Sequence, residues 1–562
     1  MQRDYFKLSL LALLLFVPFL GAVHLFDWDE INFAECAREM TLSGSWLLPT
    51  IDFEPFWEKP PFFIWMQALS MKVFGVNEFA ARFPNALCGL ATLLLIYRIG
   101  SRVHDRLFAW LWVLIWIGSI LPHFYFRSGI IDPWFNLFIF AGLYGFIAFR
   151  WQFFTAQKAG LWIWRHWHLL LGGISLGMAV MTKGPVALLI VFLTLMLYWA
   201  KYRFRNRGFF THLSYFLLAS GLAASIWFAI ETAINGFWFV REFMAYQIRL
   251  FATPDSGHGG FPGYHVVILL LGAFPASVFA IANLWGDRQS EDEMLESDTL
   301  LSCKRSDLAT WMQFLFWVVL ILFSLVKTKI VHYSSLAYYP ITYLATLTIW
   351  RAICWRQFYA YIPWVLLPIA VLLGSAVFSI PFVGQHPEWL IPLFSRDPFA
   401  AGNLEAQVEW SMYQGIPGLL LISGAALGVW YWRRQKAWLA AQVIFGSSLL
   451  FVSLTLISVV GNIEAYSQRA AVEFYQSKRG EDCYIRTMGF KSYAHLYYAD
   501  KRNHPSKFSL SETDSLLYGR LDKPVYFVAK VSNLHNLPHV QDVRELYHKN
   551  GFVFFERRPD RQ

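Results

Sequence analysis

The sequence predicts a polytopic α-helical membrane protein, and three observations lead to this fold class. Of the 562 residues, 56% are hydrophobic and only 15% are charged, whereas soluble globular proteins average about 45 to 50% apolar and about 25% charged residues. Thirteen stretches are apolar over roughly the 20 residues that a membrane-spanning helix needs. Basic residues gather in alternate loops between these stretches. Water-soluble multidomain enzymes, collagens, coiled coils and disordered chains are thereby excluded.

The predicted transmembrane domain covers residues 1–460 and begins with the first apolar run. Arg3 and Lys7 precede this run, as in a signal peptide, but no small-x-small cleavage site comes before the charged stretch that starts at Asp27. We therefore interpret the run as a membrane helix that the mature protein keeps. The spans are expected near residues 6–25, 79–99, 107–125, 131–149, 167–182, 184–200, 211–234, 263–285, 309–326, 334–351, 358–379, 416–432 and 437–460.

The distribution of Lys and Arg predicts the orientation. With the N-terminus in the cytoplasm, the inner loops carry most of the cations beside the spans, as the positive-inside rule requires. These loops and anionic lipid then explain the net charge of +9, and we find no nucleic-acid motif that would explain it otherwise. An odd number of spans places the C-terminus outside. The inner-loop cations are Arg98, Arg102, Arg106, Arg150, Lys158, Arg165, Lys201, Arg203, Arg205, Arg207, Arg351, Arg356, Arg433, Arg434 and Lys436.

The polar tail of residues 461–562 predicts a small soluble α/β domain. A strand-like run extends from Pro524 to Lys530. Apolar runs also flank a Lys549-Asn550-Gly551 turn, which is typical of a β-hairpin. The tail carries no catalytic motif that we can name.

The first outer loop begins with two acids, Asp29 and Glu30. Apolar residues recur at helical spacing from Ile31 to Met40, which predicts a short amphipathic helix in the membrane interface with its acids toward water. Acids in this place are candidates for catalysis or substrate binding. The alternative is that Asp29 is only the helix N-cap and that the following acids form a solvated face.

Two further outer segments hold acids in restricted positions. Glu58 and Lys59 lie between aromatic residues and the rigid pair Pro60-Pro61, so we expect both side chains to be preorganised. The alternative is an interfacial turn with an incidental ion pair. Asp132 lies at the outer end of the fourth span, where an aspartate is costly unless it faces a polar cavity. Asp132 is also placed to cap that helix, with a proline after it.

Basic and aromatic residues gather on the same outer face. The positive-inside rule depletes cations on this face, so their concentration there indicates an anionic ligand, for which a phosphate is well suited. Snorkelling at helix ends is the alternative, and it explains any one of these cations but not the group. The residues are Lys59, Lys183, Arg249, His258, Tyr264, His265, Lys327, Lys329, His332 and Tyr333.

Taken together, the outer motifs resemble those of the GT-C glycosyltransferases that use lipid-linked sugars. The pattern is closest to bacterial relatives of protein O-mannosyltransferases that move 4-amino-4-deoxy-L-arabinose from undecaprenyl phosphate to lipid A. The sequence departs from them at Asn32, where they have arginine, and in the loop 327–333, which lacks their Lys-Leu-Pro-x-Tyr form. The resemblance covers residues 1–460 and rests on Asp29-Glu30, Glu58-Lys59-Pro60-Pro61, Asp132, Thr182-Lys183-Gly184-Pro185 and the loop 327–333, in this order.

The resemblance implies a role for each candidate residue. It makes Asp29 and Asp132 the catalytic carboxylates. It places a divalent metal ion at Glu58 and His258, and it implies no nucleotide cofactor. The donor phosphate is expected at Lys59, Lys183 and Arg249, and other parts of the substrates at Glu30, Tyr264, Lys329, His332 and Tyr333.

We therefore expect a membrane glycosyltransferase that moves a sugar from a polyprenyl (undecaprenyl) monophosphate to an envelope acceptor, with inversion. Lipid A or a related glycolipid is the expected acceptor, and a protein is the alternative. The expected location is the bacterial inner membrane, with the active site and the C-terminal domain on the periplasmic side. A transporter or flippase is the alternative of another class, although it would place charges near the bilayer midplane and show inverted repeats, neither of which is evident.

Overall fold

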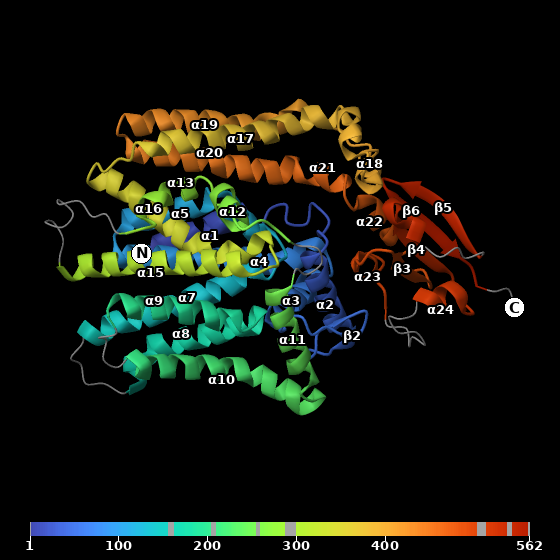
Figure 1. Ribbon diagram of the computed structural model, residues 1–562, viewed down its shortest axis with the longest axis horizontal. Coiled ribbons are helices and arrows are strands. Elements are labelled where there is room, and N and C mark those ends of the chain that lie inside the picture. The colour runs from blue at the N-terminus through green and yellow to red at the C-terminus, as the bar shows by residue number, and fades with distance from the viewer. Residues whose placement is uncertain are drawn as a thin grey trace.

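A computed structural model shows two parts of the molecule (Figure 1). Long helices form a bundle, and a four-stranded sheet with short helices lies at one end of it. The structure describes residues 2–155, 162–203, 209–253, 259–286, 299–502, 513–536 and 542–559.

Each of the thirteen predicted spans overlaps a helix of the bundle. Two of the spans are broken into shorter helices, and the others overlap single helices. The bundle contains α1 (Gln2–Phe16), α4 (Glu78–Val103), α5 (Arg106–Ile117), α6 (Ile120–Phe124), α7 (Asp132–Thr155), α8 (Trp162–Lys183), α9 (Val186–Lys201), α10 (Phe209–Asn235), α12 (Tyr264–Gly272), α13 (Ala276–Ala280), α15 (Thr299–Leu325), α16 (Tyr338–Cys354), α17 (Tyr361–Gly384), α19 (Ile416–Arg433) and α20 (Ala437–Ser458).

The length of these helices confirms a multi-pass helical fold but not the number of spans. Within the described residues, seven helices are long and apolar enough to cross a membrane, and up to nine spans result if each of two bent pairs counts as one. The pairs bend by 84° between α5 and α6 and by 110° between α12 and α13. Gly118 ends α5, and Pro275 precedes α13. Thirteen spans therefore stay a prediction.

The first outer segment folds into a helix that is buried rather than amphipathic. The helix expected from Ile31 is confirmed, but every residue from Glu30 to Met40 is buried. The C-terminal part covers it, and Arg38 binds Asp500 of that part at 3.0 Å. The expectation that the acids of this helix face water is therefore wrong for Glu30, Glu35 and Glu39. The segment contains α2 (Asp29–Ser43), β1 (Thr50–Ile51), β2 (Glu54–Pro55) and α3 (Phe62–Phe74).

Glu39 provides a test of this burial through the pH dependence of stability. Its carboxylate accepts hydrogen bonds from the Thr50 hydroxyl and the Phe53 N–H at 2.7 and 2.9 Å, while burial and the charge of Glu35 raise its pKa from 4.5 to about 8. The folded state thus binds this proton more tightly than the unfolded state does. The stabilisation of the folded state by this proton is complete below pH 4.5 and is lost as the pH rises through about 8.

We expect Glu39→Gln to remove this pH dependence and to raise the free energy of unfolding at pH 9 by about 2 to 4 kcal/mol. Thermal unfolding in detergent at pH 5 and at pH 9 would measure both effects. Glu54→Gln is the matched control, because Glu54 is exposed on the same segment. An unchanged pH dependence in Glu39→Gln would show that Glu39 is ionised in the folded protein.

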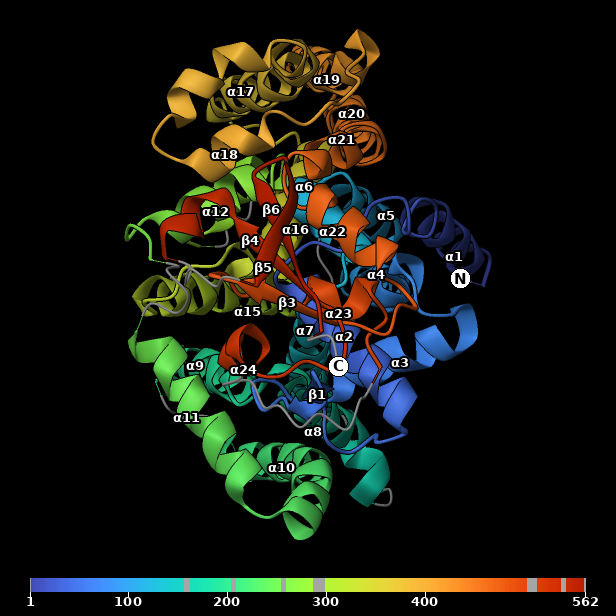
Figure 2. The ribbon, with the colours of Figure 1, turned by 90° about the vertical axis from the view of Figure 1, so that its right-hand side faces the viewer.

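The C-terminal part contains a sheet in the order β3-β4-β6-β5, seen from its end of the molecule in Figure 2. β3 pairs parallel with β4, whereas β6 pairs antiparallel with β4 and β5. The predicted hairpin is confirmed, because Lys549 pairs with Phe552 and the φ angles of Asn550 and Gly551 are 49° and 76°, as a type I′ turn requires. The elements are α22 (Arg469–Ser477), β3 (Tyr484–Met488), α23 (Ala494–Tyr498), α24 (Thr513–Tyr518), β4 (Val525–Lys530), β5 (Val543–Lys549) and β6 (Phe552–Arg557).

The sheet shares a hydrophobic core with the first outer segment. One cluster of buried apolar side chains includes Ile31 of α2, Val472 of α22 and Phe554 of β6. The predicted domain boundary at residue 461 falls in α21 (Val460–Ala465), which follows α20 with one residue between them. The division into two domains therefore stays a prediction.

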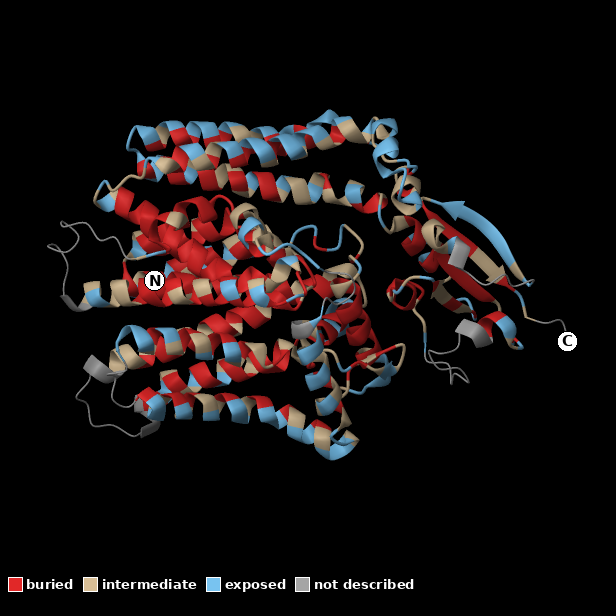
Figure 3. Cartoon of the chain, in the orientation of Figure 1, coloured by how far each residue is buried: buried red, intermediate tan, exposed pale blue. Residues whose placement is uncertain are grey.

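Burial across the bundle agrees with a membrane setting. Buried residues lie in its middle, while α10, α17 and α19 carry long exposed faces (Figure 3). These faces are apolar, with Leu218 and Leu222 on α10 and Trp364 on α17 among the most exposed hydrophobic residues. Exposed apolar surface of this extent requires lipid or another partner.

Candidate active site

Asp29 and Asp132 both lie close to His332, which is far from them in the sequence. His332 lies in a 3₁₀ helix (Val331–Ala337). Its Nε2 atom is 3.4 Å from Oδ2 of Asp29 and 3.7 Å from Oδ2 of Asp132. The two predicted catalytic carboxylates and one predicted substrate-binding residue thus form one cluster.

The Asp29 carboxylate is not used to cap its helix. Trp28 is the N-cap residue of α2, and no side chain makes a capping hydrogen bond there. The Asp29 side chain is 34% exposed, so it remains accessible to a ligand. The alternative of a purely capping role is therefore wrong for Asp29.

Asp132 is buried and only half satisfied. Its Oδ1 atom accepts a hydrogen bond from Nζ of Lys183 at 2.6 Å. Oδ2 is buried and has no hydrogen-bond partner in the described part of the chain, which is costly for a carboxylate oxygen. This oxygen is available for a substrate or for a proton on His332.

Lys183 is positioned by the tight turn between α8 and α9. Gly184 has a φ of +121°, and a Cβ atom there would lie 2.8 Å from the Phe243 ring, so the turn requires glycine. The ammonium of Lys183 lies 4.9 Å from the ring centre of Tyr333. One of its three protons serves Asp132, which leaves the others for an anion.

A second lysine reaches the same place from the first outer segment. Nζ of Lys59 lies 4.7 Å from the ring centre of Tyr246 on α11 (Trp238–Ala252), and the guanidinium of Arg249 lies 5.1 Å from the same ring. Burial and the nearby positive charge of Lys183 lower the pKa of Lys59, although Glu58 opposes the shift. Close positive charges in a partly buried place favour a bound anion.

Polar and apolar side chains together line a cavity of about 410 Å³. Lys59, Asp132, Lys183 and Tyr333 are among its polar lining residues. Its apolar lining comes from α7, from the turn before α9, from α9 and α11, and from the end of α15, so the cavity offers both cations for an anion and hydrophobic walls. The apolar lining residues are Phe135, Pro185, Val186, Leu189, Met244, Ile248, Leu250, Phe323 and Val326.

His332 lines a second cavity of about 240 Å³, and its neighbour Asp132, 3.7 Å away, lines the first. Burial lowers the pKa of His332, and the carboxylate of Asp132 opposes this shift. A neutral imidazole can donate its Nε2–H to one carboxylate at a time. The second cavity is lined by Glu30, Arg82, Arg127, Ser128 and His332 and by the apolar residues Phe19, Leu20, Val23, Phe26, Phe124, Tyr125, Ile130, Leu456 and Val460.

Two residues predicted to bind substrate make hydrogen bonds within the protein. Both carboxylate oxygens of Glu30 accept hydrogen bonds from Arg82, at 3.0 and 2.8 Å, and from the N–H groups of Phe26 and Gly129. Nζ of Lys329 donates to two carbonyls at the C-terminal end of α15, at 3.0 and 2.6 Å. These contacts give both residues a structural role, and their substrate-binding role stays a prediction.

Glu30→Ala is expected to destabilise the protein by about 3 to 5 kcal/mol, because it leaves the Arg82 guanidinium buried without its partner. The yield of folded protein and its unfolding temperature in detergent would report this loss. Glu54→Ala, in the exposed part of the same segment, should change neither. A Glu30→Ala protein that is as stable as the wild type but binds substrate poorly would instead restore the predicted substrate role.

The remaining predicted residues do not all reach the cavity. Tyr264 begins α12 and contacts the Phe261 and His265 rings, and neither Tyr264 nor Arg249 lines the 410 Å³ cavity. His258 lies outside the described residues, so its pairing with Glu58 stays a prediction. Among the residues that the structure describes, no group of three or more His, Cys, Asp or Glu side chains could hold a metal ion.

The structure adds two residues that the sequence did not indicate. Gln247 lines the cavity, and its buried Nε2 atom has no hydrogen-bond partner among the described residues. Tyr246 contacts both Lys59 and Arg249. An isolated Gln or Tyr on a helix carries no sequence signal, and only the packing of α11 against the site reveals them.

The chain is similar in sequence to known transferases. Residues 58–227 match the family model described as dolichyl-phosphate-mannose-protein mannosyltransferase. The chain is 28% identical over 337 residues to the undecaprenyl phosphate-alpha-4-amino-4-deoxy-L-arabinose arabinosyl transferase of Photorhabdus laumondii, which covers 58% of this chain and 56% of the relative. The enzyme of the same name from Pectobacterium carotovorum is 27% identical over 344 residues, or 60% of this chain and 57% of that one.

Solved structures extend the likeness to nearly the whole chain. The crystal structure of ArnT from Cupriavidus metallidurans bound to undecaprenyl phosphate superposes with a TM-score of 0.72 at 16% identity, over 98% of this chain and 97% of that chain. The chain has a helical GT-C fold. The predicted resemblance to GT-C glycosyltransferases, closest to the aminoarabinose transferases, is confirmed.

The matches differ in how much of each protein they cover. The archaeal oligosaccharyltransferase AglB from Archaeoglobus fulgidus superposes with a TM-score of 0.51 at 11% identity, over 95% of this chain and 70% of that one. The chain spans a little over half the length of the curated relatives that it matches. The family model matches residues 58–227, a region that contains Lys59, Asp132 and Lys183.

Proposed function

We propose that the protein is a membrane glycosyltransferase that moves a sugar from a polyprenyl monophosphate to an envelope acceptor. One observation carries this proposal: two lysines and Asp132 line the same 410 Å³ cavity as a larger set of apolar side chains. A sugar on a polyprenyl phosphate has the matching chemistry, with one phosphate between a sugar and a long hydrocarbon chain. The matched relatives bear the name of enzymes that act on undecaprenyl phosphate-linked aminoarabinose.

The donor phosphate is placed by Lys59 and Lys183. When the bond from the anomeric carbon to the phosphate oxygen breaks, negative charge grows on the leaving phosphate. Two lysines that are already held in a partly desolvated site stabilise that charge without reorganisation. The apolar walls hold the polyprenyl chain, and Gln247 is placed to donate its unused amide hydrogens to the phosphate or sugar.

Asp29 is the better placed of the two carboxylates to act on the acceptor. Asp132 forms a short ion pair with Lys183 at 2.6 Å. Asp29 is more exposed, and its ion-pair contact within the described residues is the longer one to His332, at 3.4 Å. Asp29 would accept the proton of an acceptor hydroxyl, or orient an acceptor phosphate, on the face opposite the leaving phosphate. The result is a single displacement with inversion. Asp132 and His332 position Lys183 and Asp29.

The second cavity supports an amphipathic acceptor such as lipid A or a related glycolipid. It is lined by His332 and combines apolar walls with Arg127. A glycolipid would present its headgroup at His332 and its acyl chains to Leu20 and Leu456. The family model named for protein mannosyltransferases keeps protein O-glycosylation as the second candidate, and a lipid-linked sugar transporter or flippase remains the alternative of another class.

A transfer assay separates these candidates. Purified protein would be incubated with undecaprenyl phosphate carrying radiolabelled aminoarabinose or mannose, together with lipid A or with an envelope protein extract. We expect label to move to lipid A and undecaprenyl phosphate to be released in equal amount. Label in protein would select the second candidate, and label that only changes leaflet on its carrier would contradict the transferase.

We further propose thirteen spans, a bacterial inner-membrane location and a periplasmic active site. We also propose that Glu58 and His258 bind a divalent metal ion. Single cysteines in a chain without its native cysteines test the orientation. Trp57→Cys should react with an impermeant thiol reagent from outside, and Tyr202→Cys only after the membrane is opened, because both residues are exposed and lie on predicted opposite faces. Reaction of both from the same side would contradict the orientation.

A chelator tests the proposed metal site. Loss of sugar transfer when a chelator is added would support a metal ion at Glu58 and His258.

A further inference from the structure

A separate polar cleft lies in the C-terminal part, between the end of α22, the start of β3 and the end of α23. Its volume is about 540 Å³, which is in the range of pockets for small ligands. None of its lining residues lines the cavity beside Asp132. Within the described residues, its charged lining consists of the cations Lys478, Arg479, Lys501 and Arg502 and the acids Glu481, Asp482 and Asp500.

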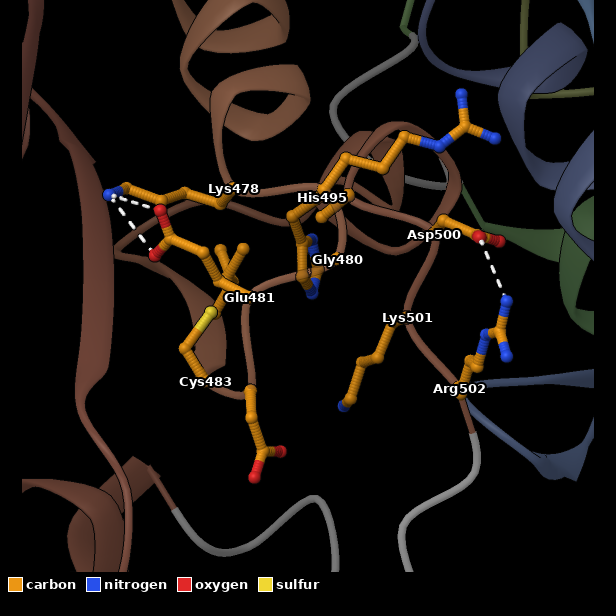
Figure 4. Close-up of a pocket in the computed structure, with 12 residues that line it drawn as sticks. Lys478, Gly480, Glu481, Cys483, His495, Asp500, Lys501 and Arg502 are labelled. Carbon is orange, nitrogen blue, oxygen red and sulfur yellow. Dashed lines mark hydrogen bonds and ion pairs between the residues drawn. The ribbon is translucent and has the colours of Figure 1, made fainter.

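His495 lies inside this cleft, between Lys478 and Asp500 (Figure 4). It is only 4% exposed, and neither of its ring nitrogens has a hydrogen-bond partner among the residues that the structure describes. Burial and the positive charges of Arg486 and Lys501 lower the pKa of His495 to about 3. The ring is therefore neutral and offers one N–H donor and one acceptor. Leaving both unused costs free energy that a ligand with hydrogen-bonding groups would recover.

Among the described residues, four cations and three acids line the cleft. Beside the cleft, Asp52 pairs with Lys501 at 2.7 Å and with Arg486 at 2.5 Å, so one carboxylate serves two cations, and in the lining Asp500 lies 4.0 Å from Arg502. At the rim, Arg479 and Arg502 are exposed. Water in the cleft would meet the hydrogen-bonding needs of a buried ring but would not balance this charge. An anion would, because Coulomb attraction is stronger in a partly buried cleft than in bulk water.

The rim of the cleft is held in place by α2. The Arg38 guanidinium donates to Oδ1 of Asp500 at 3.0 Å and to the carbonyl of Lys501 at 2.8 Å. Glu35, one turn earlier on α2, accepts two hydrogen bonds from the same guanidinium at 2.8 and 2.7 Å. A rim that is ordered before binding loses less conformational entropy when a ligand binds.

We propose that this cleft binds a phosphorylated sugar. The phosphate would lie at Lys501 and Arg502, in competition with their ion-pair partners Asp52 at 2.7 Å and Asp500 at 4.0 Å. The sugar hydroxyls would donate to one nitrogen of His495, whose other nitrogen would donate to the ligand, and to the exposed carboxylate of Glu481, whose oxygens also accept from Lys478 at 3.2 and 3.3 Å. The same chemistry belongs to a free sugar phosphate and to the phosphorylated headgroup of a glycolipid. The proposal uses no part of the transferase site and stands or fails separately from it.

Calorimetric titration of the full chain in detergent tests the proposal with glucose 1-phosphate, inorganic phosphate and glucose. We expect saturable binding of glucose 1-phosphate, weaker binding of inorganic phosphate and no binding of glucose. Arg502→Ala is expected to weaken glucose 1-phosphate binding about 10-fold, since it removes a charge-assisted hydrogen bond. Arg502 is exposed, so its removal does not disturb the core. Arg558→Ala is the matched control, because Arg558 is 74% exposed and lies outside the cleft.

His495→Phe separates the hydrogen-bonding contribution from the charge. It keeps a ring of similar shape and should weaken glucose 1-phosphate binding more than inorganic phosphate binding. Added lipid A should compete with glucose 1-phosphate if the ligand is a lipid headgroup, and should leave its binding unchanged if the ligand is free; both results agree with the proposal. Equal binding by the wild type and Arg502→Ala, or inorganic phosphate bound as tightly as glucose 1-phosphate, would overturn it.

Discussion

Asp29→Asn is expected to lower the rate of sugar transfer by about 10²- to 10⁴-fold, the usual contribution of a positioned general base. The amount of folded protein in the membrane should not change, because Asp29 is 34% exposed and its ion-pair contact with His332 is 3.4 Å long. Initial rates of label transfer from a polyprenyl phosphate sugar would measure the effect. Asp27→Asn makes the same change of charge two residues away and should retain most of the activity.

Asp132→Asn is expected to lower the rate as well, for a different reason. The amide cannot hold Lys183 and His332 as the carboxylate does, so both lose the group that positions them. Full activity in both variants would contradict the catalytic assignment. Loss of activity in only one of them would identify the carboxylate that acts on the acceptor.

Lys183→Ala and Lys59→Ala are each expected to weaken the binding of undecaprenyl phosphate by about 10- to 100-fold, because each removes a charge-assisted hydrogen bond of about 1.5 to 3 kcal/mol. Both side chains line the same cavity and would contact the same phosphate, so the loss in the double variant should be less than the sum of the two. Equilibrium binding of labelled undecaprenyl phosphate to purified protein would measure these losses.

Two further variants sharpen this prediction. Lys183→Arg should restore only part of the affinity, since a planar guanidinium does not fit the position of a compact ammonium beside Asp132. Lys72→Ala is the matched control, because Lys72 is exposed and its ammonium lies over the Trp46 ring. Donor binding that survives both Lys59→Ala and Lys183→Ala would place the phosphate elsewhere.

The helical bundle could be predicted from the sequence because lipid imposes a simple requirement. A backbone in hydrocarbon must satisfy its own hydrogen bonds, so apolar stretches of sufficient length become helices. The same reasoning located the stretches that became the bent pair of α5 and α6, but it could not show that the chain turns by 84° there. Bending depends on how neighbouring helices pack, and composition alone contains no information about that.

Among the site residues, the sequence indicated which charged groups need a partner or a ligand. Asp132 and Lys183 lie at helix ends in an otherwise apolar segment, and the structure pairs them at 2.6 Å, while their catalytic and phosphate-binding roles stay predictions. Glu30 and Lys329 are also an acid and a lysine with similar placement, yet the protein itself uses their polar atoms. A sequence shows which groups carry charge, but not which charges are already satisfied.

By itself the sequence determined a multi-pass helical protein, a resemblance to GT-C glycosyltransferases and a set of acids and lysines suited to a phosphate. Only the tertiary structure decided that Asp29, Asp132 and His332 meet, that α2 is buried beneath the C-terminal part, and that His495 lies in a separate charged cleft. The physical reason is the range of the interactions. Hydrophobic segments and capping preferences act over a few residues, whereas the pairing of Asp29 with His332, like that of Arg38 with Asp500, depends on how distant segments pack.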